Sequence, residues 1–512
     1  MTLTASDPIA GPTPPPTHSP HTHSHQPQAH GHGTADHPER RPGTDGPHTS
    51  WAVLAVALTA QILVVLDISV VNTALPSIGQ ALKLRGGDLQ WLVTAYLMMS
   101  GGGLLLGGRI ADLLSRRRVF LTGLSVFTAA SLLSGFAGNA TELIAARAGQ
   151  GLAAALMTPA ALSLITTSYS GAQRRKGLAL WGAVGSMGVA AGVLVGGALT
   201  TWAGWQTIFW INGPIGAAAL LIALKVLPNT RTAPAGLTQF DLPGAATVLG
   251  GLMSLMYALG GTATSGWLST RALTGFGAST ALLTTFVLIE HRTAAPLIPP
   301  HTWKVRSLVT GTTVMLGITG ILVGAVFLTS IYLQNVLGYS ALGAGMAFLP
   351  FAFAITAGAQ IARHLLTHTS PRTLAVTGLA VTSGAALLMS TATGHAHYAT
   401  DLLPGLVLLG LGVGMVFVPV SVTAMTGIPP QHAGVASGFL MTGHEIGAAL
   451  GVAALSAVAT TAGSLTNPVG IVAGYSRGFT AAAVIAGLIA AGAVLRMSAT
   501  PIAAGGSGMH GH

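Results

Sequence analysis

Three charged residues stand inside long apolar stretches of the sequence. Asp67 lies in QILVVLDISVV, Arg147 in LIAARAGQG and Glu445 in GHEIGAALG. An ionisable side chain at membrane depth is costly and indicates a functional site. Desolvation favours the protonated form of a carboxylic acid, so Asp67 is a candidate proton carrier. The structural alternative is an acid held by Asn72 or by a neighbouring helix for packing alone.

The other two charges allow more than one interpretation. Arg147 needs a partner inside a helix bundle because a lone buried guanidinium is unfavourable, and a static ion pair is the structural alternative. Glu445 is a second proton carrier, a counter-charge for a cationic substrate, or a hydrated side chain near the cytoplasmic entrance. Its neighbour His444 points about 100° away around a helix, so the two need not act as a pair.

The composition is that of a polytopic membrane protein. Of 512 residues, 51% are hydrophobic and 7% charged, against about 25% charged residues in soluble domains. The apolar residues form stretches near the roughly 20 residues that cross a bilayer, without the strict alternation of barrel strands. We therefore expect an all-α integral membrane protein with fourteen transmembrane helices, at residues 51–75, 91–107, 119–136, 143–165, 178–199, 207–227, 244–259, 272–289, 309–333, 345–361, 374–389, 402–425, 438–459 and 479–495.

The basic residues predict the orientation of these helices. With the amino terminus inside, 17 of the 22 Lys and Arg residues fall on the cytoplasmic side, Arg147 lies within a helix, and the external loops hold only Lys83, Arg85, Arg271 and Arg477. Basic residues gather in cytoplasmic loops, so both termini are predicted to be cytoplasmic. This distribution explains the net charge of +10 without nucleic-acid binding.

The two tails are polar and are predicted to be disordered. Residues 1–50 are rich in His and Pro, cannot bury a core and contain no apolar signal segment; residues 498–512 form a second cytoplasmic tail. Their histidines raise the alternative of a metal-linked transporter or sensor. The tract lacks the fixed spacing of a zinc site, so we expect no metal. These histidines are His18, His21, His23, His25, His30, His32, His510 and His512.

Several function classes are excluded by residues that the sequence lacks. There is no cysteine, which rules out disulfides and a thiolate nucleophile. None of the four lysines follows a glycine, which rules out a P-loop and an ATPase within this chain. The apolar segments hold too few acids and histidines for a membrane-embedded enzyme. A transporter driven by an ion gradient is the class that fits.

One loop carries a family resemblance. The run GRIADLLSRRR at residues 108–118 resembles the signature between helices 2 and 3 of the major facilitator superfamily, with Leu113 and Ser115 departing from its usual Arg and Gly. The resemblance implies a conformational latch made by charge contacts and helix dipoles. The alternative is that the Arg run only sets topology. The matching residues are Gly108, Asp112, Arg116 and Arg117.

Four further stretches are similar to the fourteen-helix drug:proton antiporter family, so that the resemblance covers about residues 51–495. They are LDISVVNTALP, Arg147 with its following Gln-Gly, residues 427–455, and a glycine ladder. His444-Glu445 replaces the usual Arg-Gln, and Val193 replaces the ladder's usual Pro. Close helix packing explains the glycines, and a role in blocking ion leak is implied only by the family. The ladder consists of Gly188, Gly192, Gly196 and Gly197.

The resemblance implies two six-helix bundles, residues 51–227 and 301–497, with two additional linking helices within 228–300. It implies an exporter of lipophilic or cationic drugs or antibiotics across the bacterial cytoplasmic membrane by alternating access. No cofactor is expected besides the proton gradient; the expected partners are a small-molecule substrate, protons and lipid, and the expected state is a monomer. The resemblance implies a coupling role for Asp67 and for Arg147, the latter near Asp67 or Asp112. The candidate residues for proton coupling or substrate binding are Asp67, Asn72, Arg147 and, as a departure from the family, Glu445. An uptake symporter of the same fold is the alternative.

Overall fold

The computed structural model describes residues 51–84, 86–227, 241–293, 296–298, 302, 304–426, 428, 433–465 and 467–497. All of them belong to one compact unit, Thr49–His512. The predictions for the tails 1–50 and 498–512, with their histidines, lie outside the described residues.

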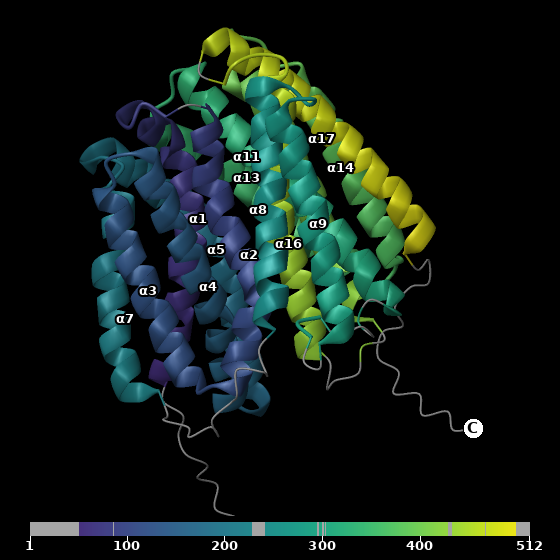
Figure 1. Ribbon diagram of the computed structural model, residues 1–512. Helices are drawn as coiled ribbons and strands as arrows, with labels where there is room; N and C mark the ends of the chain where they lie inside the picture. Colours follow the sequence, from purple (N-terminus) through teal and green to yellow (C-terminus); the bar gives the residue numbers. More distant parts are fainter. Residues whose placement is uncertain are drawn as a thin grey trace, which may run out of the picture. The chain divides into compact units, whose positions relative to one another are not determined.

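The described chain is built from helices, and no β-strand occurs among its residues (Figure 1). The first half comprises α1 (Trp51–Ala81), α2 (Gly86–Leu113), α3 (Arg116–Phe136), α4 (Ala140–Ser168), α5 (Gly171–Ala203), α6 (Thr207–Trp210) and α7 (Asn212–Val226). Two helices follow, α8 (Leu242–Ser265) and α9 (Thr270–Arg292). The second half comprises α11 (Arg306–Asn335), α12 (Ala341–Ala347), α13 (Leu349–Leu365), α14 (Pro371–Ser390), the π-helix η2 (Tyr398–Leu402), α15 (Leu403–Met425), α16 (Ala433–Thr460) and α17 (Pro468–Arg496).

Within the described residues, twelve helices are long and apolar enough to cross a membrane. The predicted all-helical membrane architecture is therefore confirmed. α2 and α5 are not among the twelve, although they are 28 and 33 residues long. The count of fourteen stays a prediction.

Prolines divide three segments that the sequence predicts as single helices. The segment 207–227 is α6 and α7, 345–361 falls in α12 and α13, and 402–425 is α15 with the end of η2 before it. Proline has no N–H and its ring clashes with the carbonyl four residues earlier. Pro214, Pro350 and Pro404 each stand within the first three residues after a break, so each segment keeps its direction but changes its local hydrogen bonding.

The last helix begins earlier than the sequence predicts. α17 starts at Pro468 rather than at residue 479 because the Asn467 side chain accepts a hydrogen bond from the Gly470 N–H at 2.7 Å and caps the helix. Arg477, predicted in an external loop, therefore lies inside α17, and Arg271 lies in the first turn of α9. The hydropathy pattern places a boundary at the charged residue, whereas the helix itself extends to the residue that caps it.

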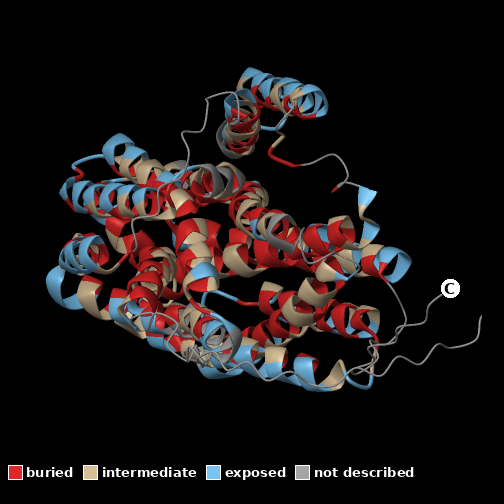
Figure 2. Cartoon of the chain, turned by 90° about the horizontal axis from the view of Figure 1, so that it is seen from below, coloured by how far each residue is buried: buried red, intermediate tan, exposed pale blue. Residues whose placement is uncertain are grey.

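The helices form two halves that pack directly on each other, chiefly through α2 and α16, and α8 contacts both of these helices. In the first half α1 packs on α5 and α4 packs on α2 and α3; in the second, α11 packs on α16, and α14 packs on α15 and α17. α8 packs on α9 and also contacts α2 of the first half and α16 of the second. In Figure 2 the buried residues lie where helices face one another, and exposed residues follow the outer faces. Large hydrophobic side chains such as Trp202, Leu268 and Phe353 are among the exposed ones, as expected of a protein whose outer surface is covered by lipid.

Candidate functional site

The centre of the first half is an ion pair between Asp67 of α1 and Arg147 of α4. The two residues are 3% and 1% exposed. Arg147 Nη1 donates to Asp67 Oδ2 and, at 3.0 Å, to Gln150 Oε1. Arg147 Nε donates to the Leu92 carbonyl of α2 at 3.1 Å. The charge of Arg147 is thus compensated inside the bundle, as the sequence requires, and its partner is Asp67.

Neutral polar groups complete the coordination of the carboxylate. Gln150 Nε2 donates to Asp67 Oδ1 at 2.9 Å and to Ser131 Oγ of α3 at 2.8 Å. Asn212 Nδ2 of α7 donates to the same Asp67 oxygen at 3.4 Å and to Ser131 Oγ at 2.8 Å. The Tyr96 ring of α2 lies 4.4 Å from Arg147 Cζ, in cation–π geometry. We call these six residues the Asp67 network.

The Asp67 carboxylate joins three helices, since α4 and α7 both donate hydrogen bonds to this residue of α1. Arg147 and two side-chain amides donate hydrogen bonds to this carboxylate. A proton on Asp67 cancels its charge and leaves Arg147 uncompensated in a low-dielectric interior. Removing one partner of a buried ion pair typically costs about 3–5 kcal/mol. The contacts that hold α1 to α4 and α7 at this point therefore include a charge whose loss would be costly.

Four members of the Asp67 network are missing from the sequence-based predictions. Gln150 carries a recognisable signal, because it follows Arg147 by one helical turn and therefore shares its face. Asn212 is a polar residue in an apolar segment. Ser131 and Tyr96 offer no such signal, since serine and tyrosine are common in membrane helices and only tertiary packing brings these two to the ion pair.

Asn72 does not join this network. Its Nδ2 donates to the Ile68 backbone carbonyl at 2.9 Å. Its backbone carbonyl accepts a hydrogen bond from Ser330 Oγ of α11 at 2.8 Å. Asn72 is therefore not the residue that holds Asp67. It belongs to a contact between the two halves of the protein.

That contact joins the end of α1 and α5 to α11 and α12. Besides the Asn72–Ser330 bond, Gln334 Nε2 donates to the Thr73 carbonyl at 3.0 Å, and the Leu342 N–H donates to Thr201 Oγ1 at 3.2 Å. These three hydrogen bonds link the two halves at this contact. All of them lie near the predicted external ends of their helices. We call this set of residues the α1/α5–α11/α12 seam.

The glycine ladder lets α5 approach two neighbours. A Cβ at Gly188, Gly192 or Gly196 would lie 2.9, 2.7 or 2.7 Å from atoms of Val65, Ser69 or Val70 on α1. Gly197 instead faces the seam, where a Cβ would lie 2.7 Å from the Ala341 carbonyl oxygen and from Leu342 Cα of α12. The ladder therefore serves close packing, and its last member serves the contact between the halves.

Glu445 lies where α16 packs on α2. A Cβ at Gly101 would be 2.5 Å from Glu445 Cβ, so the absence of a side chain on α2 makes room for this acid. Its Oε2 is buried without a hydrogen-bond partner among the described residues. Its Oε1 lies 3.5 Å from His444 Nδ1, which makes no hydrogen bond among the described residues, so the two side chains approach each other but would form an ion pair only with a protonated imidazole.

The latch loop is described only in part. Gly108 faces open space, and the Asp112 side chain lies outside the described residues. Arg117 Nη2 donates to the Leu224 carbonyl of α7 at 2.5 Å, which caps the carboxyl end of that helix. Arg116 Nε is buried without a described partner. The observed role of Arg117 is to tie α3 to α7, and the latch stays a prediction.

Metal ligands do not cluster in the described part of the chain. No group of three or more His, Asp or Glu side chains there is arranged to hold an ion.

The fold and the site together define a class of protein. Two bundles of membrane-length helices that pack on each other match the paired halves from which many secondary transporters are built. Residues 57–452 match the Major Facilitator Superfamily, and the chain belongs to this family. The resemblance drawn from the sequence motifs is confirmed.

Known relatives are similar over most of their length. The puromycin resistance protein pur8 of Streptomyces alboniger is 40% identical over 84% of this chain and 87% of its own. The cephamycin export protein CmcT of Amycolatopsis lactamdurans is 37% identical over 86% and 91%. The crystal structure of the nucleoside transporter NupG aligns with a TM-score of 0.60 and 12% identity over 87% of this chain and 99% of that one; it supports the fold alone.

Proposed function

We propose that this protein is a proton-coupled exporter of lipophilic or cationic drugs or antibiotics. The observation that carries the proposal is the Asp67 network: a carboxylate buried at membrane depth and held by a guanidinium. The relatives that bear the names of puromycin, cephamycin and tetracenomycin C resistance or export proteins support the substrate class. The energy source is the proton gradient, and no cofactor is required.

Helix α1 couples protonation of Asp67 to the seam. Asp67 and Asn72 lie on one helix, five residues or about 7.5 Å apart along its axis. When a proton neutralises Asp67, α1 loses its attraction to Arg147, while Arg147 keeps Gln150, the Leu92 carbonyl and the Tyr96 ring. The same helix presents the carbonyls of Asn72 and Thr73 to α11. Protonation thereby shifts the populations of the closed and open seam, and substrate leaves as protons enter.

We further propose fourteen transmembrane helices, with α2 and α5 added to the twelve already described, and a monomer with both termini cytoplasmic. α2 and α5 exceed the roughly 20 residues that a span requires. Each also packs along a helix that is long and apolar enough to cross a membrane: α2 packs on α4, and α5 packs on α1.

The orientation is tested by reporter fusions. A reporter joined after Arg118 or Arg175 is expected to read cytoplasmic, and one in the loop between α1 and α2 is expected to read external, because of the asymmetry of basic residues. An external reading after Arg118 would reverse the orientation and the direction of transport.

The function is tested in proteoliposomes with an imposed pH gradient. Three substrates are offered separately: puromycin, one uncharged antibiotic, and ethidium, which is a permanent cation. Movement of drug against its gradient, driven by opposite movement of protons, is expected. Drug movement in the same direction as protons would indicate the uptake symporter instead. Transport that is insensitive to the pH gradient and to ionophores would refute proton coupling.

Glu445→Gln separates the two roles of the second acid. We propose that Glu445 is a counter-charge for cationic substrates, since its Oε2 is buried without a described partner and lies at the contact of α2 with α16. The variant is expected to slow transport of a cationic substrate about tenfold or more and leave a neutral one within about twofold, because a desolvated ion pair needs both members. Equal loss for both substrates would make Glu445 a proton carrier, and no loss for either would make it a bystander.

A further inference from the structure

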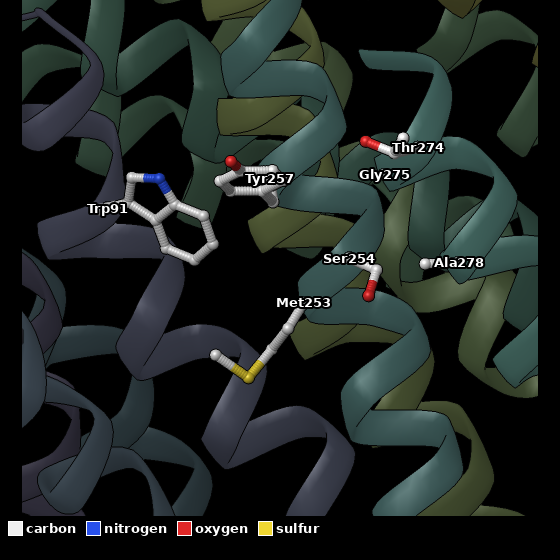
Figure 3. A pocket seen from close by; sticks show the side chains of 7 residues that line it. All are labelled: Trp91, Met253, Ser254, Tyr257, Thr274, Gly275 and Ala278. Carbon is white, nitrogen blue, oxygen red and sulfur yellow. The ribbon is translucent and has the colours of Figure 1, made fainter. Parts of the chain in front are cut away.

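A groove lies where α2, α8 and α9 meet, apart from the Asp67 network and the seam (Figure 3). Its volume is about 440 Å³. Trp91 of α2 forms one wall, Met253 and Tyr257 of α8 form the floor, and Thr274 and Ala278 of α9 form the other wall. Figure 3 shows the Trp91 and Tyr257 rings near one another, with the Met253 side chain below them.

A charged residue stands at one end of this groove. Arg271, Thr274 and Ala278 share one face of α9, since they are separated by three and four residues. The Arg271 guanidinium lies over the Tyr257 ring, with Cζ 4.5 Å from its centroid. Arg271 Nε is buried without a hydrogen-bond partner among the described residues. Gly261 of α8 makes room for the Arg271 stem, because a Cβ there would lie 2.9 Å from Arg271 Cγ. The guanidinium is thus held in place, with donor capacity unused.

The groove lies beside the least covered of the membrane-length helices in the described chain. α9 packs chiefly on α8, and its span is 22% buried, the lowest fraction among the twelve. Arg271 is in the first turn of α9 and Trp91 is near the start of α2, so the groove begins at a membrane surface. Tryptophan and tyrosine prefer that level of the bilayer, where an apolar body and a polar edge are both accommodated.

We propose that this groove binds one anionic phospholipid. Its phosphodiester accepts hydrogen bonds from Arg271, and an acyl chain lies along Trp91, Met253 and Ala278. Charge complementarity favours an anionic lipid. An uncharged acyl chain would leave the guanidinium without a hydrogen-bond acceptor, and a soluble anion would leave the apolar groove unfilled. Because α8 contacts both α2 and α16, the lipid would lie against a helix that touches both halves.

The test is native mass spectrometry of the purified protein titrated with dioleoyl phosphatidylglycerol or dioleoyl phosphatidylcholine. The wild type is expected to bind one phosphatidylglycerol in preference to phosphatidylcholine. Arg271→Gln is expected to weaken phosphatidylglycerol about tenfold and leave phosphatidylcholine unchanged. Ala278→Trp, at an exposed position in the wall, fills the groove and is expected to weaken both lipids.

The matched control is Arg477→Gln, which removes an exposed guanidinium of α17 outside the groove. It is expected to bind phosphatidylglycerol as the wild type does. Equal loss in Arg477→Gln and Arg271→Gln would show that only surface charge matters, and would overturn the proposal. So would Arg271→Gln with wild-type preference, or Ala278→Trp with undiminished binding of both lipids. Thermal unfolding of each variant separates misfolding from lost binding.

Discussion

Asp67→Asn is expected to abolish drug transport driven by a pH gradient. The variant keeps the shape of the side chain but can neither carry the proton nor compensate Arg147, whose Nη1 donates to Asp67 Oδ2 in the wild type. An uncompensated buried charge costs about 3–5 kcal/mol of stability, so a lower unfolding temperature is also expected. Gradient-driven transport in proteoliposomes and thermal unfolding in detergent are the two measurements.

A double variant tells a coupling role from a packing role. Asp67→Asn with Arg147→Gln removes both charges, so most of the lost stability is expected to return while gradient-driven transport stays absent. Glu142→Gln, at the exposed start of α4, is the control for loss of one acid and is expected to transport normally. If the double variant regained both stability and uphill transport, the ion pair would be a static element and another group would carry the proton.

Gly197→Ala is expected to open the α1/α5–α11/α12 seam. Its Cβ would lie 2.7 Å from the Ala341 carbonyl oxygen and from Leu342 Cα, and backbone atoms cannot rotate away as a side chain can. Overpacking costs about 1–3 kcal/mol, which corresponds to a population shift of about 5- to 150-fold. This cost destabilises the state with a closed seam. It does not affect a state in which the two halves are separated at this end.

The shift is measured by cysteine labelling. The chain contains no cysteine, so Ser330→Cys introduces a unique thiol, at a position that is 0% exposed while the seam is closed. Maleimide labelling in detergent is expected to be slow in that background and at least fivefold faster when Gly197→Ala is added. Gly188→Ala, which meets only the Val65 side chain within the first half, is the control and is expected to leave the rate unchanged. A Gly197→Ala rate equal to that of the control would show that the seam tolerates the added methyl.

The sequence by itself determined the class of protein and which charged residues inside the apolar helices are candidates for function. A composition of 51% hydrophobic and 7% charged residues leaves no material for a water-facing surface, and the spacing of the apolar stretches leaves only helices. Asp67 and Arg147 stand out because charge in lipid is costly wherever the helix lies in the bundle. The loop and helix motifs narrowed the family, because they match over most of the chain.

Tertiary structure decided which groups meet. Arg147 had two candidate partners, Asp67 and Asp112, and packing of α1 on α4 brings it to Asp67. Ser131 and Tyr96 enter the site only because α2 and α3 face the same point, and no local pattern reports that. The same helix packing takes Asn72 to α11 and places Glu445 against the bare backbone of Gly101.

Helix ends were likewise decided by hydrogen bonds rather than by hydropathy. Asn467 caps α17 ahead of Arg477, and Pro214 and Pro350 divide stretches that are uniformly apolar. An apolar count measures only the transfer of side chains to lipid. It does not include capping hydrogen bonds, the missing N–H of proline or contacts between distant helices. These interactions determine the position of each functional side chain.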